Sequence, residues 1–134
     1  MTSVLVRHAS AGDRDDWTED DRLRPLDARG LRQAAGLVAL LLPFAPHRVV
    51  SSPYARCVQT VEPLAAALGV PVEHDERLAE GAGRAALELL DEDGVVCCTH
   101  GDVVGDVLGH GLKKGAAVVL SEGQVVREIS APKV

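Results

Sequence analysis

Three short apolar runs constrain this chain more than any other feature, because each one ends abruptly in polar residues. The runs fall in residues 4–6, 48–51 and 95–99, and β-branched and small aliphatic residues dominate them. Apart from Arg48 at the start of the second, the runs are uncharged, and such runs are typical of strands buried on both faces of a parallel sheet. The residues that follow the three runs are Arg7-His8, Ser52-Pro53 and His100-Gly101.

Segments with helical spacing separate these strands. We predict helices over 27–42, with Asp27 as N-cap and Leu31, Ala34, Ala35, Val38 and Leu42 on the apolar face, and over 54–68, ended by Gly69 and kinked or broken at Pro63. Shorter helices are predicted over 84–91 and 103–108. An edge strand over 70–73 and a hairpin of 116–120 with 124–129 complete the pattern. The polar segment 13–22 is predicted to be a surface loop that Trp17 anchors to the body.

Strands that alternate with helices predict an α/β fold, a three-layer α/β/α arrangement with a mostly parallel central sheet. The 134 residues suit one domain that spans the whole chain, 1–134. Aromatic residues make up only 2% of the chain and the net charge is -6, which disfavours nucleic acid as a partner.

The sequence predicts a cytoplasmic protein with neither signal peptide nor membrane span, because no apolar segment of the required length is present. Its three cysteines have neither the number for a disulfide framework nor the spacing of a metal site. We therefore predict no cofactor, no bound metal and no membrane partner. The sequence makes no prediction of oligomeric state.

Chemistry-bearing residues follow each of the three strands, and the carboxyl ends of parallel strands share one edge of the sheet. Arg7, His8 and His100 come at two of these ends, and Arg56 lies one helical turn beyond the third. Arginine offers a planar fork of donors that matches phosphate oxygens. Histidine acts as a nucleophile or a proton carrier near neutral pH. The pattern predicts a site for a phosphoryl group that needs neither a metal nor a P-loop.

Three motifs in register resemble the histidine phosphatase superfamily, which has the phosphoglycerate mutase-like fold. A further segment, 22–30 with Gln33-Ala34, is similar to the compact branch of that superfamily. This branch contains the SixA-type phosphohistidine phosphatases and the phosphatase-like domains fused to MutT-like Nudix hydrolases. The three motifs are Leu5-Val6-Arg7-His8-Ala9, Ser51-Ser52-Pro53-Tyr54-Ala55-Arg56-Cys57-Val58-Gln59-Thr60 and Thr99-His100-Gly101-Asp102.

The resemblance implies a role for four of these residues. His8 matches the nucleophile that carries the phosphoryl group, and it must attack as a neutral imidazole whose other nitrogen has a backbone acceptor. Arg7 and Arg56 match the arginines that hold the phosphate oxygens. His100 matches the second histidine, which stabilises the group in transfer. Ala9 replaces the glycine that is commonest after the Arg-His pair in the family.

Several residues are candidates for the general acid that protonates the leaving group. Glu80 is the first candidate, because residues 77–81 are similar to the region that carries the acid in larger members. Asp102 and Asp13 are alternatives, and a good leaving group would need no acid at all. Ser10 is a candidate for a hydrogen bond to phosphate, and Arg14 is a candidate substrate contact.

We therefore predict a metal-independent phosphatase that forms a phosphohistidine on His8. Its substrate would be a phosphohistidine protein or a small phosphate ester or nucleotide. The alternative is a non-catalytic or regulatory phosphate-binding domain associated with a Nudix-type hydrolase. A mutase is the weakest reading, because 134 residues leave little room for the insertions that reorient a phosphorylated intermediate.

Overall fold

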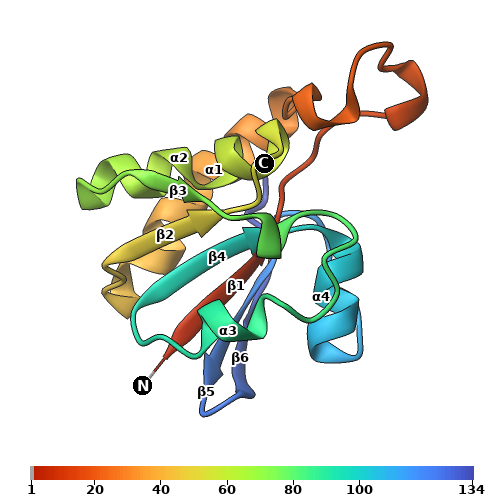
Figure 1. The fold of residues 1–134 in the computed structure, drawn as a ribbon. Helices are drawn as coiled ribbons and strands as arrows, with labels where there is room; N and C mark the ends of the chain where they lie inside the picture. The colour runs from red at the N-terminus through yellow and green to blue at the C-terminus, as the bar shows by residue number, and fades with distance from the viewer. Residues whose placement is uncertain (1) are drawn as a thin grey trace.

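A six-stranded mixed sheet forms the centre of the molecule (Figure 1). The structure is a computed structural model in which residues 2–134 are described. The strand order is β3-β2-β4-β1-β5-β6, with the three predicted buried strands in the interior of the sheet. The strands are β1 (Ser3–Arg7), β2 (Arg48–Ser51), β3 (Val72–His74), β4 (Val95–Thr99), β5 (Ala117–Ser121) and β6 (Gln124–Ile129).

Strands β3, β2, β4 and β1 run parallel, whereas β5 and β6 are antiparallel to their neighbours. In the register of the central pair, Val6 lies opposite Cys98 and Arg7 opposite Thr99. The carboxyl ends of β1 and β4 therefore stand at the same level, as the motif order required. A two-residue turn joins β5 to β6, and both Glu122 and Gly123 have the positive φ of a hairpin turn, 52° and 78°.

Two pairs of helices cover the two faces of the sheet (Figure 1). Helices α1 (Ala28–Leu41) and α2 (Ala55–Leu68) pack on one face, with Leu37, Val61 and Leu64 in an aliphatic core against β1, β2 and β4. Helices α3 (Leu87–Leu90) and α4 (Gly101–Leu108) pack on the other, where Leu89 and Val104 join a second core. The expected three-layer α/β/α architecture is confirmed.

The predicted apolar face of α1 is wrong in detail. Leu31 is 53% exposed and Leu42 lies beyond the helix at 40% exposed, whereas Gln33 and Leu37 are buried. Apolar residues lie around more than half of this helix, so periodicity alone admits more than one buried face. The contact between Gly30 and the Ser10 carbonyl, in the loop after β1, decides which face of α1 is buried.

Of the kink or break expected at Pro63, the break is absent, since α2 runs without interruption from Ala55 to Leu68. Proline removes one helical hydrogen bond, but the burial of Leu64 and Ala65 against the sheet holds the helix in register. The third predicted helix is shorter than expected, a single turn at Leu87–Leu90, and the fourth begins two residues earlier, at Gly101.

Residues 13–24 project beyond the carboxyl edge of the sheet as an arm, drawn in red-orange in Figure 1. Two 3-10 turns, Arg14–Asp16 and Asp21–Leu23, shape this segment. Trp17 does not anchor it to the body by a hydrogen bond, because its Nε1 donates to the Asp20 carbonyl within the segment, at 2.9 Å. Within residues 2–134 no helix has the length and apolarity to cross a membrane.

Candidate active site

A pocket of about 650 Å³ opens at the carboxyl edge of the sheet. Strand β1 delivers Arg7 and His8 to it, and the backbone of His8 is fixed on both sides: its N–H donates to Thr99 at 3.0 Å and its carbonyl accepts from Gly115 at 3.0 Å. The pocket is lined by Arg7, His8, Gly12, Asp13, Arg14, Arg24, Arg56, Glu80, His100, Gly101, Asp102 and Lys114.

The His8 imidazole is held as a neutral base with one defined nitrogen free. Its Nδ1 lies 2.8 Å from the Ala9 carbonyl, which can only accept, so the proton sits on Nδ1 and Nε2 keeps its lone pair. Burial, together with the charges of His100, Arg56 and Arg7, lowers the pKa of His8 to about 3. The backbone acceptor that a histidine nucleophile requires is therefore present.

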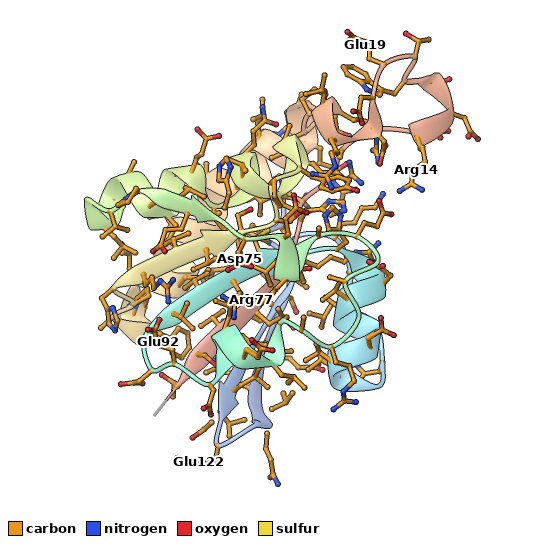
Figure 2. All side chains as sticks on the ribbon, viewed as in Figure 1. Arg14, Glu19, Asp75, Arg77, Glu92 and Glu122 are labelled. Atoms are coloured by element: carbon orange, nitrogen blue, oxygen red, sulfur yellow. The ribbon has the colours of Figure 1, made fainter. Side chains whose placement is uncertain are left out.

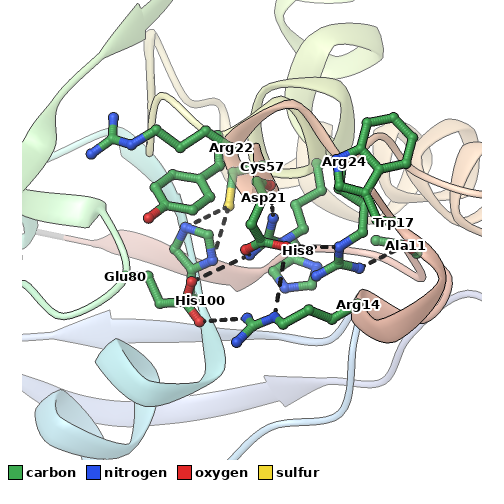
Figure 3. A network of polar contacts seen from close by, with 12 residues as sticks. His8, Ala11, Arg14, Trp17, Asp21, Arg22, Arg24, Cys57, Glu80 and His100 are labelled. Atoms are coloured by element: carbon green, nitrogen blue, oxygen red, sulfur yellow. Dashed lines mark hydrogen bonds and ion pairs between the residues drawn. The ribbon is translucent and has the colours of Figure 1, made fainter. Parts of the chain in front are cut away.

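His100 faces His8 edge-on across the pocket, with ring centroids 5.5 Å apart and planes at 67° (Figure 3). Its Nε2 lies 2.8 Å from the Ser52 hydroxyl at the end of β2, and Tyr54 packs against the ring at 4.5 Å. The Cys57 sulfur lies 3.5 Å from the same Nε2. Residues of the second motif thus orient the histidine of the third.

Arg56 is the most deeply buried cation of the site, at 1% exposed. Its Nη1 donates to the Asp21 carbonyl at 2.8 Å and its Nη2 to the Asp21 carboxylate at 2.9 Å. Nη2 also lies 3.4 Å from Glu80. Within residues 2–134 the buried Nε of Arg56 has no acceptor. A buried donor without a partner costs free energy, so this nitrogen favours an incoming oxyanion.

Arg7 has a similar unsatisfied nitrogen. Its Nη1 donates to the Leu112 carbonyl at 2.6 Å, while its buried Nε has no partner in the part of the chain described. Burial lowers the pKa of Arg7. A β-carbon on Gly101 would come within 2.9 Å of the Arg7 Cζ, so the glycine that follows His100 leaves the space in which this guanidinium lies.

The three candidate acids, Glu80, Asp102 and Asp13, all line the pocket, but each carboxylate has different hydrogen-bond or ion-pair partners. Glu80 is paired with Arg14, at 2.7 Å, and with Arg56. The Asp102 carboxylate accepts the Gly81 N–H at 2.7 Å and so fixes the loop that carries Glu80. Asp13 caps the first turn of the arm by accepting from the Asp15 N–H.

The arm contributes to the pocket more than the sequence indicated. Figure 2 shows Arg14 on the side of the arm that faces the body, whereas Glu19 lies at its far end. Asp21 pairs with Arg24 at 3.0 Å as well as with Arg56 (Figure 3). Although burial acts against it, these two hydrogen bonds hold the pKa of Asp21 below its usual range.

Two cations that line the pocket, Arg24 and Lys114, were not among the predicted site residues, and neither was Asp21, which pairs with Arg56. Arg24 is 7% exposed and donates to the Ala11 carbonyl at 2.8 Å, which ties the loop after β1 to the arm. The segment that resembles the compact branch contains Arg24, so the sequence carried a signal for it. Neither Asp21 nor Lys114 lies in a motif.

Ser10 is the one predicted site residue that does not line the pocket. Its hydroxyl donates to the Asp27 carboxylate at 2.7 Å, and its N–H donates to Gln33. Asp27 also caps α1 through the Gly30 N–H, as predicted. The Asp27 carboxylate thus draws the Ser10 hydroxyl toward the start of α1. Across residues 2–134 no group of three or more His, Cys, Asp or Glu side chains is arranged to hold a metal ion.

The fold and the pocket together define an α/β protein that presents two histidines and two deeply set arginines at the carboxyl edge of its sheet. The chain belongs to the histidine phosphatase superfamily (branch 1), whose family model matches residues 3–89. The expected class, a phosphatase-type hydrolase, is confirmed at the level of the family.

One relative by sequence is an 8-oxo-(d)GTP phosphatase of Mycolicibacterium smegmatis, which is 38% identical over 112 residues. The match covers 77% of this chain and 35% of that protein, so the chain spans about a third of the length of this relative.

Two solved structures share the fold over nearly the whole length of both chains. The protein histidine phosphatase SixA in complex with tungstate superposes with a TM-score of 0.74 at 22% identity, covering 97% of each chain. A mycobacterial glucosyl-3-phosphoglycerate phosphatase in complex with VO3 gives a TM-score of 0.75 at 15% identity, covering 97% of this chain and 99% of that one. The predicted phosphoglycerate mutase-like fold is confirmed.

Proposed function

We propose that the chain is a metal-independent phosphatase that transfers a phosphoryl group first to His8 and then to water. The observation that carries the proposal is the state of His8, whose Nδ1 is occupied by the Ala9 carbonyl and whose lowered pKa leaves Nε2 unprotonated in a cationic pocket. A site that only bound phosphate would gain nothing from a buried, neutral imidazole, because a charged donor would bind the anion better.

In the first step His8 Nε2 attacks phosphorus, an N–P bond forms, and the bond to the leaving oxygen breaks with its electron pair on that oxygen. In this proposal Arg7 and Arg56, which line the pocket and each keep a buried Nε without a partner, donate to the phosphoryl oxygens. We assign His100, which lines the same pocket, as the further donor to these oxygens. In the second step water attacks phosphorus and releases phosphate and neutral His8.

Glu80 is our proposed proton donor to the leaving oxygen. In the free protein it is an acceptor for Arg14 and Arg56. A phosphate dianion would compete for both guanidinium groups and so release the Glu80 carboxyl from its two partners. Asp102 is engaged with Gly81 and fits better as the residue that positions the Glu80 loop.

Trapping the intermediate tests the nucleophile. Rapid quench with a ³²P-labelled substrate is expected to give an acid-labile, base-stable phosphoprotein, which His8→Ala abolishes together with turnover. Circular dichroism should show that the variant is folded, since His8 stands at a strand end. An alanine variant that keeps more than about a thousandth of the wild-type rate would overturn the assignment.

Comparing leaving groups tests the acid. Glu80→Gln is expected to slow alkyl phosphate hydrolysis by about 10²–10⁴-fold and aryl phosphate hydrolysis much less, because a low-pKa phenol leaves without a proton. Asp102→Asn is the matched variant and should slow both substrates equally. If the dependence on the leaving group appears in Asp102→Asn instead, the role belongs to Asp102. Equal losses in Glu80→Gln would leave Glu80 only a positioning role.

The substrate class within this proposal is a phosphohistidine protein or a small phosphate ester or nucleotide. The names of two similar proteins point to such substrates: one is a protein histidine phosphatase, and the other is an 8-oxo-(d)GTP phosphatase. We propose a cytoplasmic protein in which 1–134 forms one histidine phosphatase domain. A phosphate-release screen that includes phosphohistidine protein, sugar phosphates and nucleotides, with His8→Ala as blank, would identify the substrate.

A second candidate is a regulatory phosphate-binding domain that works with a Nudix-type hydrolase. It is favoured by one observation, that the relative named 8-oxo-(d)GTP phosphatase is about three times as long as the matched region. This candidate predicts phosphate binding without turnover and without a trapped phosphoprotein. The quench experiment therefore decides between the two.

A further inference from the structure

A second cavity of about 440 Å³ adjoins the candidate active site and shares Arg7 and Lys114 with it. It lies where the loop after β1, the start of α1 and the loop before β5 meet. The mechanism proposed above makes no use of this cavity. Its lining is Arg7, Ser10, Arg29, Gln33, Lys113, Lys114 and Ala131.

The charge of this cavity is of one sign. Arg29, Lys113 and Lys114 line it together with Arg7, and no carboxylate does. Within residues 2–134 none of these four cations forms a salt bridge. The nearby Asp27 carboxylate already accepts from Ser10 and from the backbone at the start of α1. In a chain of net charge -6, four cations without carboxylate partners make a local positive field.

Gln33 adds a buried neutral donor to the cavity. The residue is 3% exposed, and its Oε1 accepts the Ser10 N–H at 2.9 Å, which turns the amide so that Nε2 is the remaining donor. In the part of the chain described, no acceptor takes a hydrogen bond from this Nε2. Gly115, at φ +83°, lies so close that a β-carbon there would be 3.3 Å from Nε2. A buried amide donor beside unpaired cations is the donor set that an oxyanion requires.

We propose that this cavity binds the second phosphate of a diphosphate substrate while the terminal phosphoryl group lies at His8. The proposal rests on the phosphatase function and names its substrate class. The two cavities share Arg7, so two anions bound in them would be neighbours, and the two phosphates of a diphosphate share one bridging oxygen. Arg7 keeps Nε and Nη2 free to contact both, since only its Nη1 is taken by Leu112.

The reaction balances with water as the only co-reactant. His8 Nε2 takes the terminal phosphoryl group, and the bond from its phosphorus to the bridging oxygen breaks. The bridging oxygen leaves with the second phosphate as a monophosphate ester, which Arg29 and Lys113 hold. Water then hydrolyses the phosphohistidine. The products are one phosphate and one monophosphate ester.

Calorimetric binding of inorganic pyrophosphate and inorganic phosphate tests the cavity without any need for turnover. The wild-type protein should bind pyrophosphate about tenfold or more tightly than phosphate. The double variant Arg29→Gln/Lys113→Gln should lose most of that ratio, since neither residue lines the first pocket. Arg32→Gln, one turn along α1 from Arg29 and outside both cavities, is the matched control and should keep it. An unchanged ratio in the double variant overturns the proposal, as does equal binding of the two anions by the wild type.

Turnover of three substrates separates this proposal from the phosphatase function itself. A nucleoside diphosphate and methyl diphosphate should both be hydrolysed with a higher kcat/KM than the nucleoside monophosphate, and the double variant should abolish only this advantage. A gain confined to the nucleoside diphosphate would assign the preference to the base and overturn the phosphate assignment. If no substrate is hydrolysed but the pyrophosphate preference persists, the phosphatase function fails and the second anion site stands.

Discussion

At the scale of single residues, the site depends on which nitrogen atoms are already occupied. His8 has one nitrogen bound to Ala9 and one free, and Arg7 and Arg56 each keep a buried Nε without a partner. The carboxylates of Asp21, on the arm, and of Glu80 both lie close to Nη2 of Arg56. Hydrogen bonds and ion pairs thus hold the phosphate donors in position in the free protein, which lowers the cost of ordering them at binding.

The buried state of His8 predicts a pH dependence of stability. Because the folded pKa of about 3 lies below the value of 6.5 in the unfolded chain, unfolding takes up a proton below pH 6.5. The contribution of His8 to the free energy of unfolding is fully present above pH 6.5. It falls by about 1.4 kcal/mol per pH unit as the pH drops toward 3. Urea unfolding between pH 6.5 and 5 should show this slope in the wild type and a smaller one in His8→Gln. The exposed His74→Gln serves as control, and equal slopes in His8→Gln and the wild type would contradict the expectation.

At the scale of elements, close backbone approaches decide how the helices meet the site. Helix α1 touches the loop after β1 at Gly30, where a β-carbon would overlap the Ser10 carbonyl oxygen. The same helix supplies Asp27 and Gln33, which hold Ser10 through its hydroxyl and its N–H. The position of α1 therefore sets the path of the chain that leaves His8.

Gly30→Ala is expected to destabilise the protein by about 1–3 kcal/mol, because the loop or the helix must move to admit the methyl group. Gly105→Ala is the matched control in α4, where a β-carbon would meet nothing within 4 Å. That change should stabilise the protein by up to about 1 kcal/mol through helix propensity. Denaturant midpoints measure both effects. A Gly30→Ala variant as stable as the wild type would show that the contact relaxes at no cost.

At the scale of the whole molecule, the arm of residues 13–24 closes one side of the pocket, and charge holds it to the body. Asp21 lies 2.9 Å from Arg56 on α2 and 3.0 Å from Arg24 within the arm, while Arg14 reaches Glu80 on the opposite loop. A third ion pair, between Arg22 and Glu76, also joins this polar segment to the body.

Asp21→Asn is expected to loosen the arm. Trp17, the only tryptophan of the chain, lies on it and reports its motion through fluorescence anisotropy. The anisotropy should fall in the variant, and trypsin should cleave faster after Arg22. Asp16→Asn removes a charge from the same arm without breaking an ion pair and should resemble the wild type. Identical anisotropy in all three proteins would mean that packing, not charge, fixes the arm.

Local pattern alone predicted the strands, the layer order and the convergence of Arg7, His8, Arg56 and His100. Each of these follows from short-range rules, since an apolar run that ends in polar residues is a strand end, and parallel strand ends share an edge. The N-cap at Asp27 and the C-terminal Gly69 of α2 were predictable for the same reason, because capping involves residues only a few positions apart.

The tertiary structure decided everything that depends on partners far apart in the chain. It pairs Asp21 with Arg56, turns Ser10 away from the pocket toward Asp27, and buries Gln33 beside the second cavity. It also carries α2 through Pro63, where local propensity favours a break. In each case long-range packing outweighs a local preference of about 1–3 kcal/mol, and no pattern within a few residues records which packing wins.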